Sequence, residues 1–232
     1  MVEVRAVSDT ACRYLNMLVY GPAGTGKTYL AKTAADAGHK VLVIDAESGV
    51  MSVRDSKCSV VSVTNTSDVK EAVKHVSETL GTYDVIFLDS LTEVQQQYVT
   101  KYKGKGDKIT MEAWGFIISR TFALVRYLRD LPVSIVVTCL PQDLQDEGTG
   151  AVLTRPALNG KKLPHQVAGM FDLVAYSSKR GVKDGLEYVL QFAAPGERYL
   201  TKDRSGRLPA VCPSDYGQIY RTVFNETRNE KR

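Results

Sequence analysis

One glycine-rich segment carries the residues whose types and spacing best fit phosphate chemistry. Gly21, Gly26, Lys27 and Thr28 occupy the fixed positions of the pattern G-x-x-x-x-G-K-[ST]. Glycines let consecutive backbone N–H groups curl around a phosphate chain, which side chains at those positions would obstruct. The Lys27 ammonium can reach the β- and γ-phosphates, and the Thr28 hydroxyl can complete the coordination shell of Mg²⁺. The segment therefore predicts a site for a nucleoside triphosphate and its metal ion.

The residues around this pattern support the same prediction. The residues expected to cradle the phosphates are Gly21, Pro22, Ala23, Gly24, Thr25, Gly26, Lys27 and Thr28. A short, mostly apolar run before them predicts a strand, and a helical stretch follows them. The helix would direct the positive end of its dipole at the phosphates. Because strand, loop and helix follow in this order, a chance glycine-rich turn is a poor explanation.

Acidic residues follow two further apolar runs. Residues 85–88 are apolar and lead into Asp89, and residues 41–45 lead to Glu47. A carboxylate at Asp89 can orient the water shell of Mg²⁺ from the side opposite Thr28. Adjacent parallel strands would bring Glu47 to the edge that holds the phosphates, where it can polarise the attacking water. We expect Asp89 and Thr28 to hold the metal and Glu47 to be catalytic; the alternative is that Glu47 only caps a strand end.

Two cations near the C-terminus have a spacing that suits charge stabilisation. Lys202 and Arg204 are two residues apart on an extended segment, so their side chains point the same way. Such a pair can stabilise the charge on a γ-phosphate bound by a neighbouring subunit. The expected catalytic residues are then Glu47, Lys27, Lys202 and Arg204. On spacing alone, a solvated basic loop explains the pair at least as well.

Two basic segments have the composition of surfaces that contact single-stranded nucleic acid. The first, 101–108, is expected to be a flexible loop between two helices with tyrosines close by, and the second, 141–164, a long loop with an acidic tip. Mobile lysines near aromatic rings can neutralise phosphates while bases stack on the rings. The expected DNA contacts are Lys101, Lys103, Lys105, Lys108, Arg155, Lys161 and Lys162. Ordinary solvated loops explain these charges about as well.

The elements that must position these residues alternate along the chain. Strands are expected at 14–20, 41–45, 59–63, 84–89 and 133–139, and helices near 28–37, 67–80, 91–101 and 111–130. This alternation predicts an α/β fold with a mainly parallel, twisted sheet flanked by helices. Residues 174–178 and 186–192 predict a C-terminal antiparallel hairpin, and 213–215 resemble the start of a last helix.

Length and composition favour one domain over 1–232, with a core over about 14–210 and a terminal helix and tail over 213–232. No run approaches the ~18 apolar residues of a membrane span, and no secretion signal is recognisable at the N-terminus. The four scattered cysteines favour reduced thiols. We therefore expect a cytoplasmic protein without membrane contact. The net charge of +4 permits nucleic-acid binding without requiring it.

Together these segments resemble the RecA-like core ATPases. The glycine-rich segment, the two acid-ended runs and the Lys202-x-Arg204 pair occur in the order of that superfamily. The closest similarity is to phage nucleotide-binding proteins of the single-strand annealing recombinase type. The segments that carry this similarity are 83–93, 128–132, 155–158 and 202–206. The resemblance extends over most of the chain.

This resemblance implies a RecA-like P-loop ATPase with ATP and Mg²⁺ as cofactors and single-stranded DNA as partner. It further implies phage recombination or annealing in the host cytoplasm, a homo-oligomeric ring or filament, and a single-strand-binding protein as a second partner. Lys202 and Arg204 resemble the pair that ring helicases insert into the adjacent subunit's site. One departure concerns coupling: RecA proteins end the fourth core strand in a glutamine that senses the γ-phosphate, whereas here Gln142 lies further on.

Three alternatives to a DNA-dependent ATPase stay open. The first is an ATP-switched DNA-annealing module without productive turnover, and the second is a ring-helicase-type motor, which the Lys-x-Arg pair favours. The third is a small-molecule kinase. Nucleoside monophosphate kinases close an arginine-rich lid over the donor, and the 141–164 segment has only Arg155 to offer, so the kinase is the least favoured.

Overall fold

The computed structural model describes residues 14–103, 108–145, 148–183, 185–193 and 198–225. Within these residues nine strands form one sheet in the order β11-β9-β8-β1-β5-β4-β2-β3, with β10 paired to β8. The strands are β1 (Asn16–Tyr20), β2 (Val41–Asp45), β3 (Ser59–Ser62), β4 (Val85–Asp89), β5 (Ser134–Cys139), β8 (Leu173–Val182), β9 (Gly185–Gln191), β10 (Lys202–Asp203) and β11 (Val211–Pro213). The sheet is parallel from β3 to β8 and antiparallel beyond.

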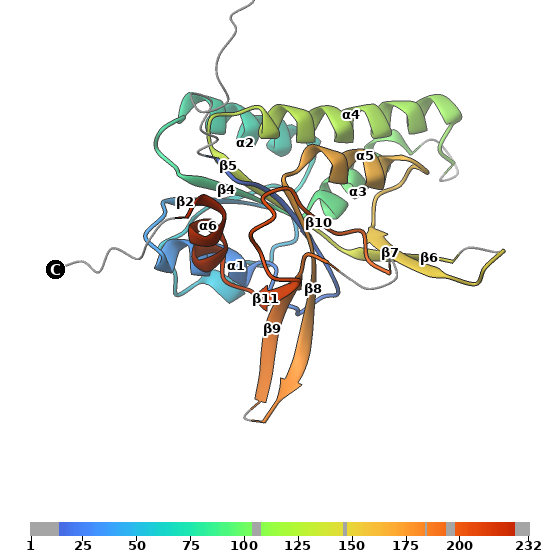
Figure 1. Cartoon of the computed structure of the whole chain (residues 1–232). Coiled ribbons are helices and arrows are strands. Elements are labelled where there is room, and N and C mark those ends of the chain that lie inside the picture. Colours follow the sequence, from blue (N-terminus) through green and yellow to red (C-terminus); the bar gives the residue numbers. More distant parts are fainter. Residues whose placement is uncertain (1–13, 104–107, 146–147, 184, 194–197, 226–232) are drawn as a thin grey trace, which may run out of the picture.

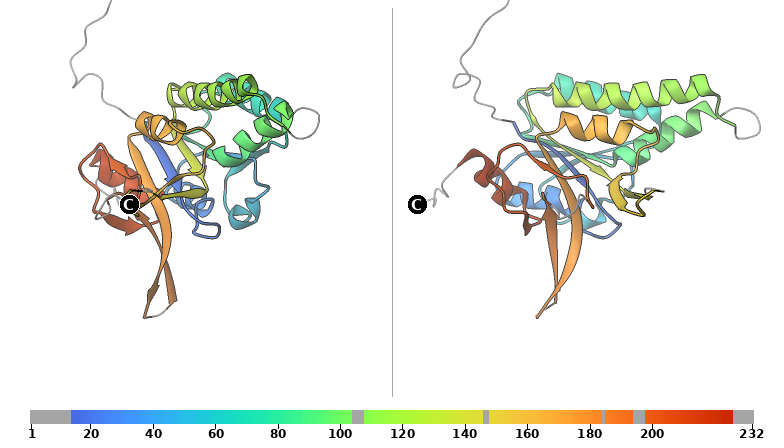
Figure 2. Two further views of the ribbon diagram at one scale, coloured as in Figure 1. Left: turned by 90° about the vertical axis from the view of Figure 1, so that its right-hand side faces the viewer. Right: turned by 45° about the vertical axis from the view of Figure 1, so that its right-hand side comes forward.

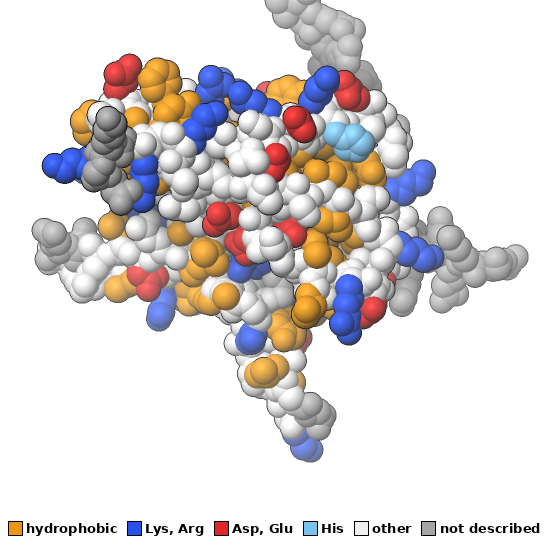
Figure 3. All heavy atoms as spheres, turned by 180° about the vertical axis from the view of Figure 1, so that it is seen from behind, with side chains coloured by type: hydrophobic (Ala, Val, Ile, Leu, Met, Phe, Trp, Pro, Cys, Tyr) orange, Lys and Arg blue, Asp and Glu red, His pale blue; other side chains and the backbone are white. Residues whose placement is uncertain are grey.

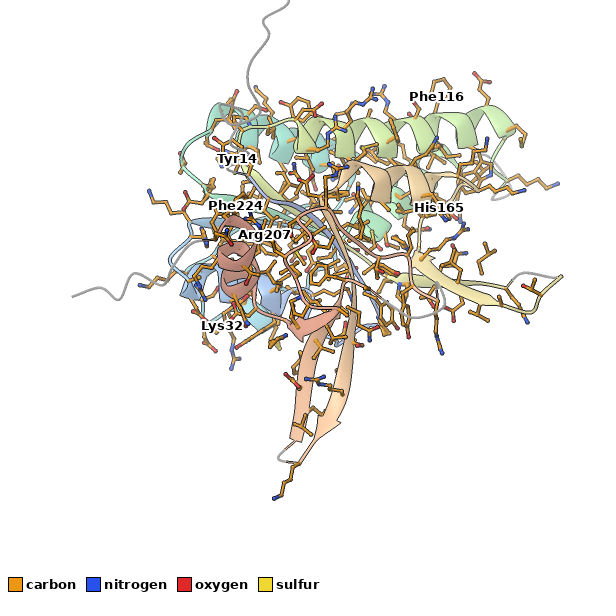
Figure 4. The ribbon with its side chains drawn as sticks, viewed as in Figure 1. Tyr14, Lys32, Phe116, His165, Arg207 and Phe224 are labelled. Carbon is orange, nitrogen blue, oxygen red and sulfur yellow. The ribbon has the colours of Figure 1, made fainter. Side chains whose placement is uncertain are left out.

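Helices cover both faces of this sheet (Figures 1 and 2). One face packs against α2 (Thr66–Glu78), α3 (Leu91–Tyr102), α4 (Met111–Arg129) and α5 (Leu163–Met170), and the other against α1 (Tyr29–Asp36), α6 (Tyr216–Phe224) and the short 3₁₀ helix η2 (Val50–Val53). In Figure 4, Phe116 on α4 and Lys32 on α1 mark the two opposite helical layers. Because both faces are covered, β2, β4 and β5 are buried along their whole length, and their sequences are apolar runs without alternation. The predicted α/β fold is confirmed.

Local side-chain caps explain why the helices begin where the sequence predicts. Asn65 accepts hydrogen bonds from the backbone N–H groups of Ser67 and Asp68 at the start of α2. Ser90, Thr110 and Asp215 cap α3, α4 and α6 in the same manner. A capping oxygen satisfies N–H groups that have no partner inside the helix. The predicted helices and parallel strands accordingly agree with the structure to within two residues at almost every end.

The expectation of a long loop over 141–164 is wrong. β6 (Pro141–Gln145) and β7 (Val152–Pro156) form an antiparallel hairpin, and α5 begins at the end of the segment. The hairpin is held by contacts from distant parts of the chain: the Tyr20 hydroxyl donates to the Thr154 carbonyl over 2.9 Å. A local sequence pattern does not show such a long-range contact. The turn-forming residues of the segment therefore led to the prediction of a loop.

The C-terminal antiparallel hairpin is confirmed and is longer than predicted. β8 continues to Val182 and β9 begins at Gly185, so the two strands stand out from the body of the molecule (Figures 1 and 2). Their outer part carries exposed hydrophobic side chains on Val182, Leu186 and Tyr188. The terminal helix is confirmed as α6. None of the described helices is long and apolar enough to cross a membrane.

Candidate active site

The glycine-rich segment connects β1 to α1, and its backbone conformation explains its glycines. Gly24 and Gly26 have φ angles of +73° and +86°, a region that side chains disfavour. Gly21 faces the neighbouring strand β8, and a Cβ on it would lie 2.3 Å from the carbonyl oxygen of Ser177. Glycine is therefore required at these positions for two reasons, backbone conformation and close approach.

The side chain of Lys27 folds back onto the start of the glycine-rich segment. Its ammonium donates to the carbonyl oxygens of Gly21 and Pro22 over 2.8 and 2.9 Å, and the residue is only 7% exposed. Burial lowers the pKa of Lys27, and the carboxylates of Glu47 and Asp89 oppose that shift. A partly desolvated ammonium beside two carbonyls is positioned to transfer its hydrogen bonds to phosphate oxygens.

Thr28 and Asp89 meet as the sequence predicts. The Thr28 hydroxyl donates to Asp89 Oδ2 over 2.5 Å, and the hydroxyl of Thr138 on β5 donates to Asp89 Oδ1. Asp89 is 2% exposed; burial raises the pKa of its carboxyl, and the hydrogen bonds from Thr138 and Thr28 act against that rise. A hydroxyl and a carboxylate oxygen are ligands suited to a hard cation, so these residues fit Mg²⁺.

Glu47 lies in the same site, although β2 is not adjacent to β1 as expected. β5 and β4 separate the two strands, and β2 instead pairs with β4 so that Asp45 lies beside Asp89. All these strands are parallel, so Glu47 still reaches their common carboxyl edge. The hydroxyl of Ser90 donates to Glu47 Oε1 and orients its carboxylate. Asp45 stabilises the turn after β2, because its carboxylate accepts hydrogen bonds from the backbone N–H groups of Glu47 and Gly49.

Three of these residues, Lys27, Thr28 and Glu47, line one pocket of about 560 Å³. Its lining comes from the glycine-rich segment, Lys27, Thr28 and Glu47, together with Tyr29, Ser52, Leu140 and Tyr188. The pocket lies at the carboxyl end of parallel strands, where open α/β sheets bind ligands. Sequence reasoning did not assign Thr138, Ser90 or Tyr188 to the site. A polar residue inside the apolar run of β5 was a signal for Thr138; Tyr188 had none.

Lys202 and Arg204 lie at the amino-terminal ends of the parallel strands, whereas the pocket lies at their carboxyl ends. The Lys202 ammonium donates to the carbonyl oxygen of Phe171 over 2.6 Å, and Arg204 forms an ion pair with Asp172 over 2.6 Å. Phe171 and Asp172 come just before β8. Because β8 runs parallel to β1, the start of β8 lies beside the start of β1. The glycine-rich segment follows the far end of β1. The pair therefore does not contact the pocket of its own chain.

The residues expected to contact DNA have different surroundings. Lys101, Lys103 and Lys108 are exposed at the connection between α3 and α4, and Lys161 and Lys162 are exposed before α5. Lys105 lies outside the described residues.

The structure corrects the expectation that Arg155 lies on the surface as a DNA contact. Arg155 is 8% exposed and donates to the carbonyl oxygen of Lys161, so it supports this segment from inside.

The glycine-rich segment between β1 and α1 and the pocket beside it are those of the P-loop class of nucleotide-binding proteins. The AAA-domain family AAA_24 matches residues 13–205, most of the chain. The chain belongs to this family of AAA domains. Membership implies nucleotide binding and ATPase chemistry in general, with Mg²⁺ as the usual metal.

No curated protein matches the chain. Two solved structures that match are distant. A KaiC-like protein from the hyperthermophilic archaeon Pyrococcus horikoshii OT3 is 12% identical over 76% of this chain and 77% of its own, with a TM-score of 0.44. The flagellar accessory protein FlaH from Methanocaldococcus jannaschii is 12% identical over 82% and 79%, with a TM-score of 0.41. Neither likeness is close enough to transfer a function.

Proposed function

We propose that this protein is a Mg²⁺-dependent ATPase that acts on single-stranded DNA in recombination or annealing, as a homo-oligomer. The observation that carries the catalytic part is that Lys27, Thr28 and Glu47 line one pocket, with Asp89 hydrogen-bonded to Thr28 behind it. Each side chain has a separate role in phosphoryl transfer to water, and the three roles come from three different strand ends.

The proposed mechanism assigns one step to each group. Lys27 gives up its carbonyl partners and contacts the β- and γ-phosphates. Thr28 and Asp89 would hold Mg²⁺, which would supply charge neutralisation at the phosphates. Glu47, oriented by Ser90, accepts a hydrogen bond from the attacking water and polarises it. Lys202 and Arg204 of an adjacent subunit stabilise the charge that develops on the γ-phosphate.

The proposed DNA surface lies on the side where α3 meets α4. Lys101 lines a groove of about 210 Å³ between α2, α3 and α4 together with Lys70, Arg120, Tyr98, Tyr102 and Tyr127. Cations and aromatic rings in one groove suit a single strand, whose phosphates and bases need both. Figures 1 and 2 show the start of α4 and the β6–β7 hairpin on the same side of the molecule. Lys161 and Lys162 follow this hairpin and extend the proposed path.

The decisive experiment measures ATP hydrolysis with and without single-stranded DNA across a salt series, with Lys27→Ala as the blank. We expect DNA to stimulate the rate several-fold and salt to weaken the stimulation, because phosphate contacts release counterions. A rate that is indifferent to DNA would contradict the DNA role and leave small-molecule kinase substrates and protein partners to be tested.

A pair of double variants tests the position of the DNA surface. Lys101→Ala with Lys103→Ala should weaken binding of labelled single-stranded DNA and reduce the salt slope by about 0.7 for each phosphate that the lysines no longer neutralise. Lys40→Ala with Lys57→Ala removes the same charge elsewhere on the exposed surface and serves as the control. Equal weakening in both double variants would indicate only a net-charge effect.

A further inference from the structure

The β8–β9 hairpin is built against the phosphate-binding loop. β8 pairs with β1 as far as Tyr20 and Tyr176 and then continues past the end of β1, alongside the loop. The buried hydroxyl of Ser177 donates to the Thr25 carbonyl over 3.0 Å, and the carbonyl of Ser177 is in close approach to Gly21. The base of the hairpin is therefore fixed to the loop.

Lys179 and Tyr188 extend this contact toward the bound phosphates. Lys179 is two residues beyond Ser177, so it lies on the same face of β8. Its Nζ lies 3.5 Å from the place that a Cβ on Gly24 would occupy. Tyr188 is the direct cross-strand partner of Lys179 on β9, and its Cδ1 lies 3.2 Å from the corresponding place on Gly26. The Lys179 ammonium lies 5.6 Å from the centre of the Tyr188 ring.

Both side chains retain the capacity to bind a ligand. Lys179 is exposed, and no carboxylate of the described residues pairs with it, whereas its neighbour Arg180 is paired with Glu187 over 2.7 Å. Tyr188 lines the pocket yet is 42% exposed, so its ring is held at the loop without being buried. In Figure 3 the hairpin stands clear of the body and carries both hydrophobic and basic side chains.

We propose that Lys179 and Tyr188 contact the bound nucleotide in cis, Lys179 at the phosphates and Tyr188 at the nucleoside. The inference rests on the proposed nucleotide site and adds a second lysine and an aromatic ring to it. An ammonium beside a loop of N–H donors attracts the anion that the loop holds. An aromatic face beside the phosphate loop offers a surface for the base or ribose. The ligand class is a nucleoside di- or triphosphate.

Calorimetric titration with Mg·ADP and a non-hydrolysable ATP analogue tests the role of Lys179. Lys179→Met should weaken the binding of both nucleotides about tenfold, equivalent to 1.4 kcal/mol. Lys183→Met removes the same charge from the outer end of the same hairpin and should leave both dissociation constants unchanged. Equal dissociation constants for Lys179→Met and the wild type would overturn the assignment of Lys179.

Tripolyphosphate separates the role of Tyr188 from that of Lys179. Tyr188→Leu should weaken nucleotide binding severalfold and leave tripolyphosphate binding unchanged, while Tyr188→Phe restores nucleotide binding. Lys179→Met should weaken both ligands. Leu186→Ala, another exposed apolar residue of β9, is the control. If Tyr188→Leu weakens tripolyphosphate as much as nucleotide, the ring only supports the loop and the nucleoside contact is wrong.

Failure of this inference can be distinguished from failure of the proposed function. If the wild type binds nucleotide and Lys27→Ala does not, the pocket is a nucleotide site whatever the hairpin variants show. If the wild type binds neither nucleotide nor tripolyphosphate, the proposed function itself is contradicted. Thermal unfolding midpoints within about 2 °C of the wild type confirm that the exposed substitutions leave the fold intact.

Discussion

At the scale of single residues, Glu47 is the group that we propose activates water, and a neighbouring hydroxyl orients it in the pocket. Its carboxylate accepts from the Ser90 hydroxyl at the start of α3, and its charge opposes the lowering of the Lys27 pKa that burial causes. It also adds to the rise in the pKa of Glu93, a second acid near the site, of which burial is the larger cause. The charge of one carboxylate therefore affects the pKa of both Lys27 and a neighbouring acid.

Glu47→Gln removes the proposed base but keeps the size of the side chain. We expect kcat for ATP hydrolysis to fall by about 10²–10⁴, with nucleotide affinity changed by less than about threefold, since general-base catalysis acts on the chemical step. Steady-state hydrolysis and calorimetric binding measure the two effects. Glu71→Gln, an exposed acid on α2, is the control. A kcat within threefold of the wild type would show that another group activates water.

The buried cysteines should be inert to alkylation. Burial raises the pKa of Cys139 to about 12 and that of Cys212 to about 11. Because the thiolate is the nucleophile, a raised pKa leaves less of it at pH 8 than a free thiol has. We expect iodoacetamide at pH 8 to modify both residues slowly in the native protein and rapidly in denaturant, as mass spectrometry would show. Rapid native labelling of Cys139 would contradict its burial in the core.

At the scale of elements, the loop between β1 and α1 is confined by its neighbour β8. Ser177 contacts it through the backbone at Gly21 and through the hydroxyl at Thr25. The strand that holds the loop also supplies the first half of the exposed hairpin. The geometry of the phosphate site thus depends on a strand that is more than 150 residues away in the chain.

Gly21→Ala tests this confinement, and Gly115→Ala is its control. The two substitutions should change the free energy of unfolding in opposite directions. Gly21→Ala places a Cβ 2.3 Å from the Ser177 carbonyl, so we expect the free energy of unfolding to fall by about 1–3 kcal/mol. Gly115→Ala, inside α4 with nothing within 4 Å of the new Cβ, should raise it by about 0.5–1 kcal/mol. Urea unfolding measures both. A neutral Gly21→Ala would mean that β8 moves freely away from the loop.

At the scale of the whole molecule, the pocket and the Lys202–Arg204 pair occupy opposite edges of one sheet. The pair lies beside the residues that precede β8, and the pocket lies beyond the end of β1, which β8 parallels. One chain cannot bring the two together without breaking its sheet. If the pair acts in catalysis, a second copy of the chain must supply it.

Complementation between two inactive variants tests this expectation. Lys27→Ala lacks a phosphate-binding lysine, and Arg204→Ala lacks the proposed finger, which is worth about 10³–10⁵ in kcat where such residues have been tested. Mixing them should restore activity, since some interfaces combine an intact pocket with an intact Arg204. Specific activity of the wild type should also fall on dilution. A mixture no more active than the sum of its parts would contradict action in trans.

Much of the fold and part of the site could be predicted from the sequence. The helix caps, the apolar runs of β2, β4 and β5, and the glycine-rich segment are local patterns, and each carries its own signal. Glu47 was expected near the glycine-rich segment because parallel strands present their carboxyl ends at one edge, and Asp89 was expected to share a metal ion with Thr28 because it ends an apolar run; both lie at the site. These features depend on residues that are close in sequence or on a general rule of sheet architecture.

Other features exist only once the chain has folded. The β6–β7 hairpin, the burial of Arg155, the hydroxyl of Thr138 on Asp89 and the position of Tyr188 beside Gly26 all depend on contacts between segments that are far apart in the chain. Propensity and periodicity describe how a segment folds by itself, whereas these contacts exist because packing and register bring two segments together. Local patterns were enough to establish a phosphate-binding loop in a parallel sheet; the register of β8 against β1 determined which further side chains complete its pocket.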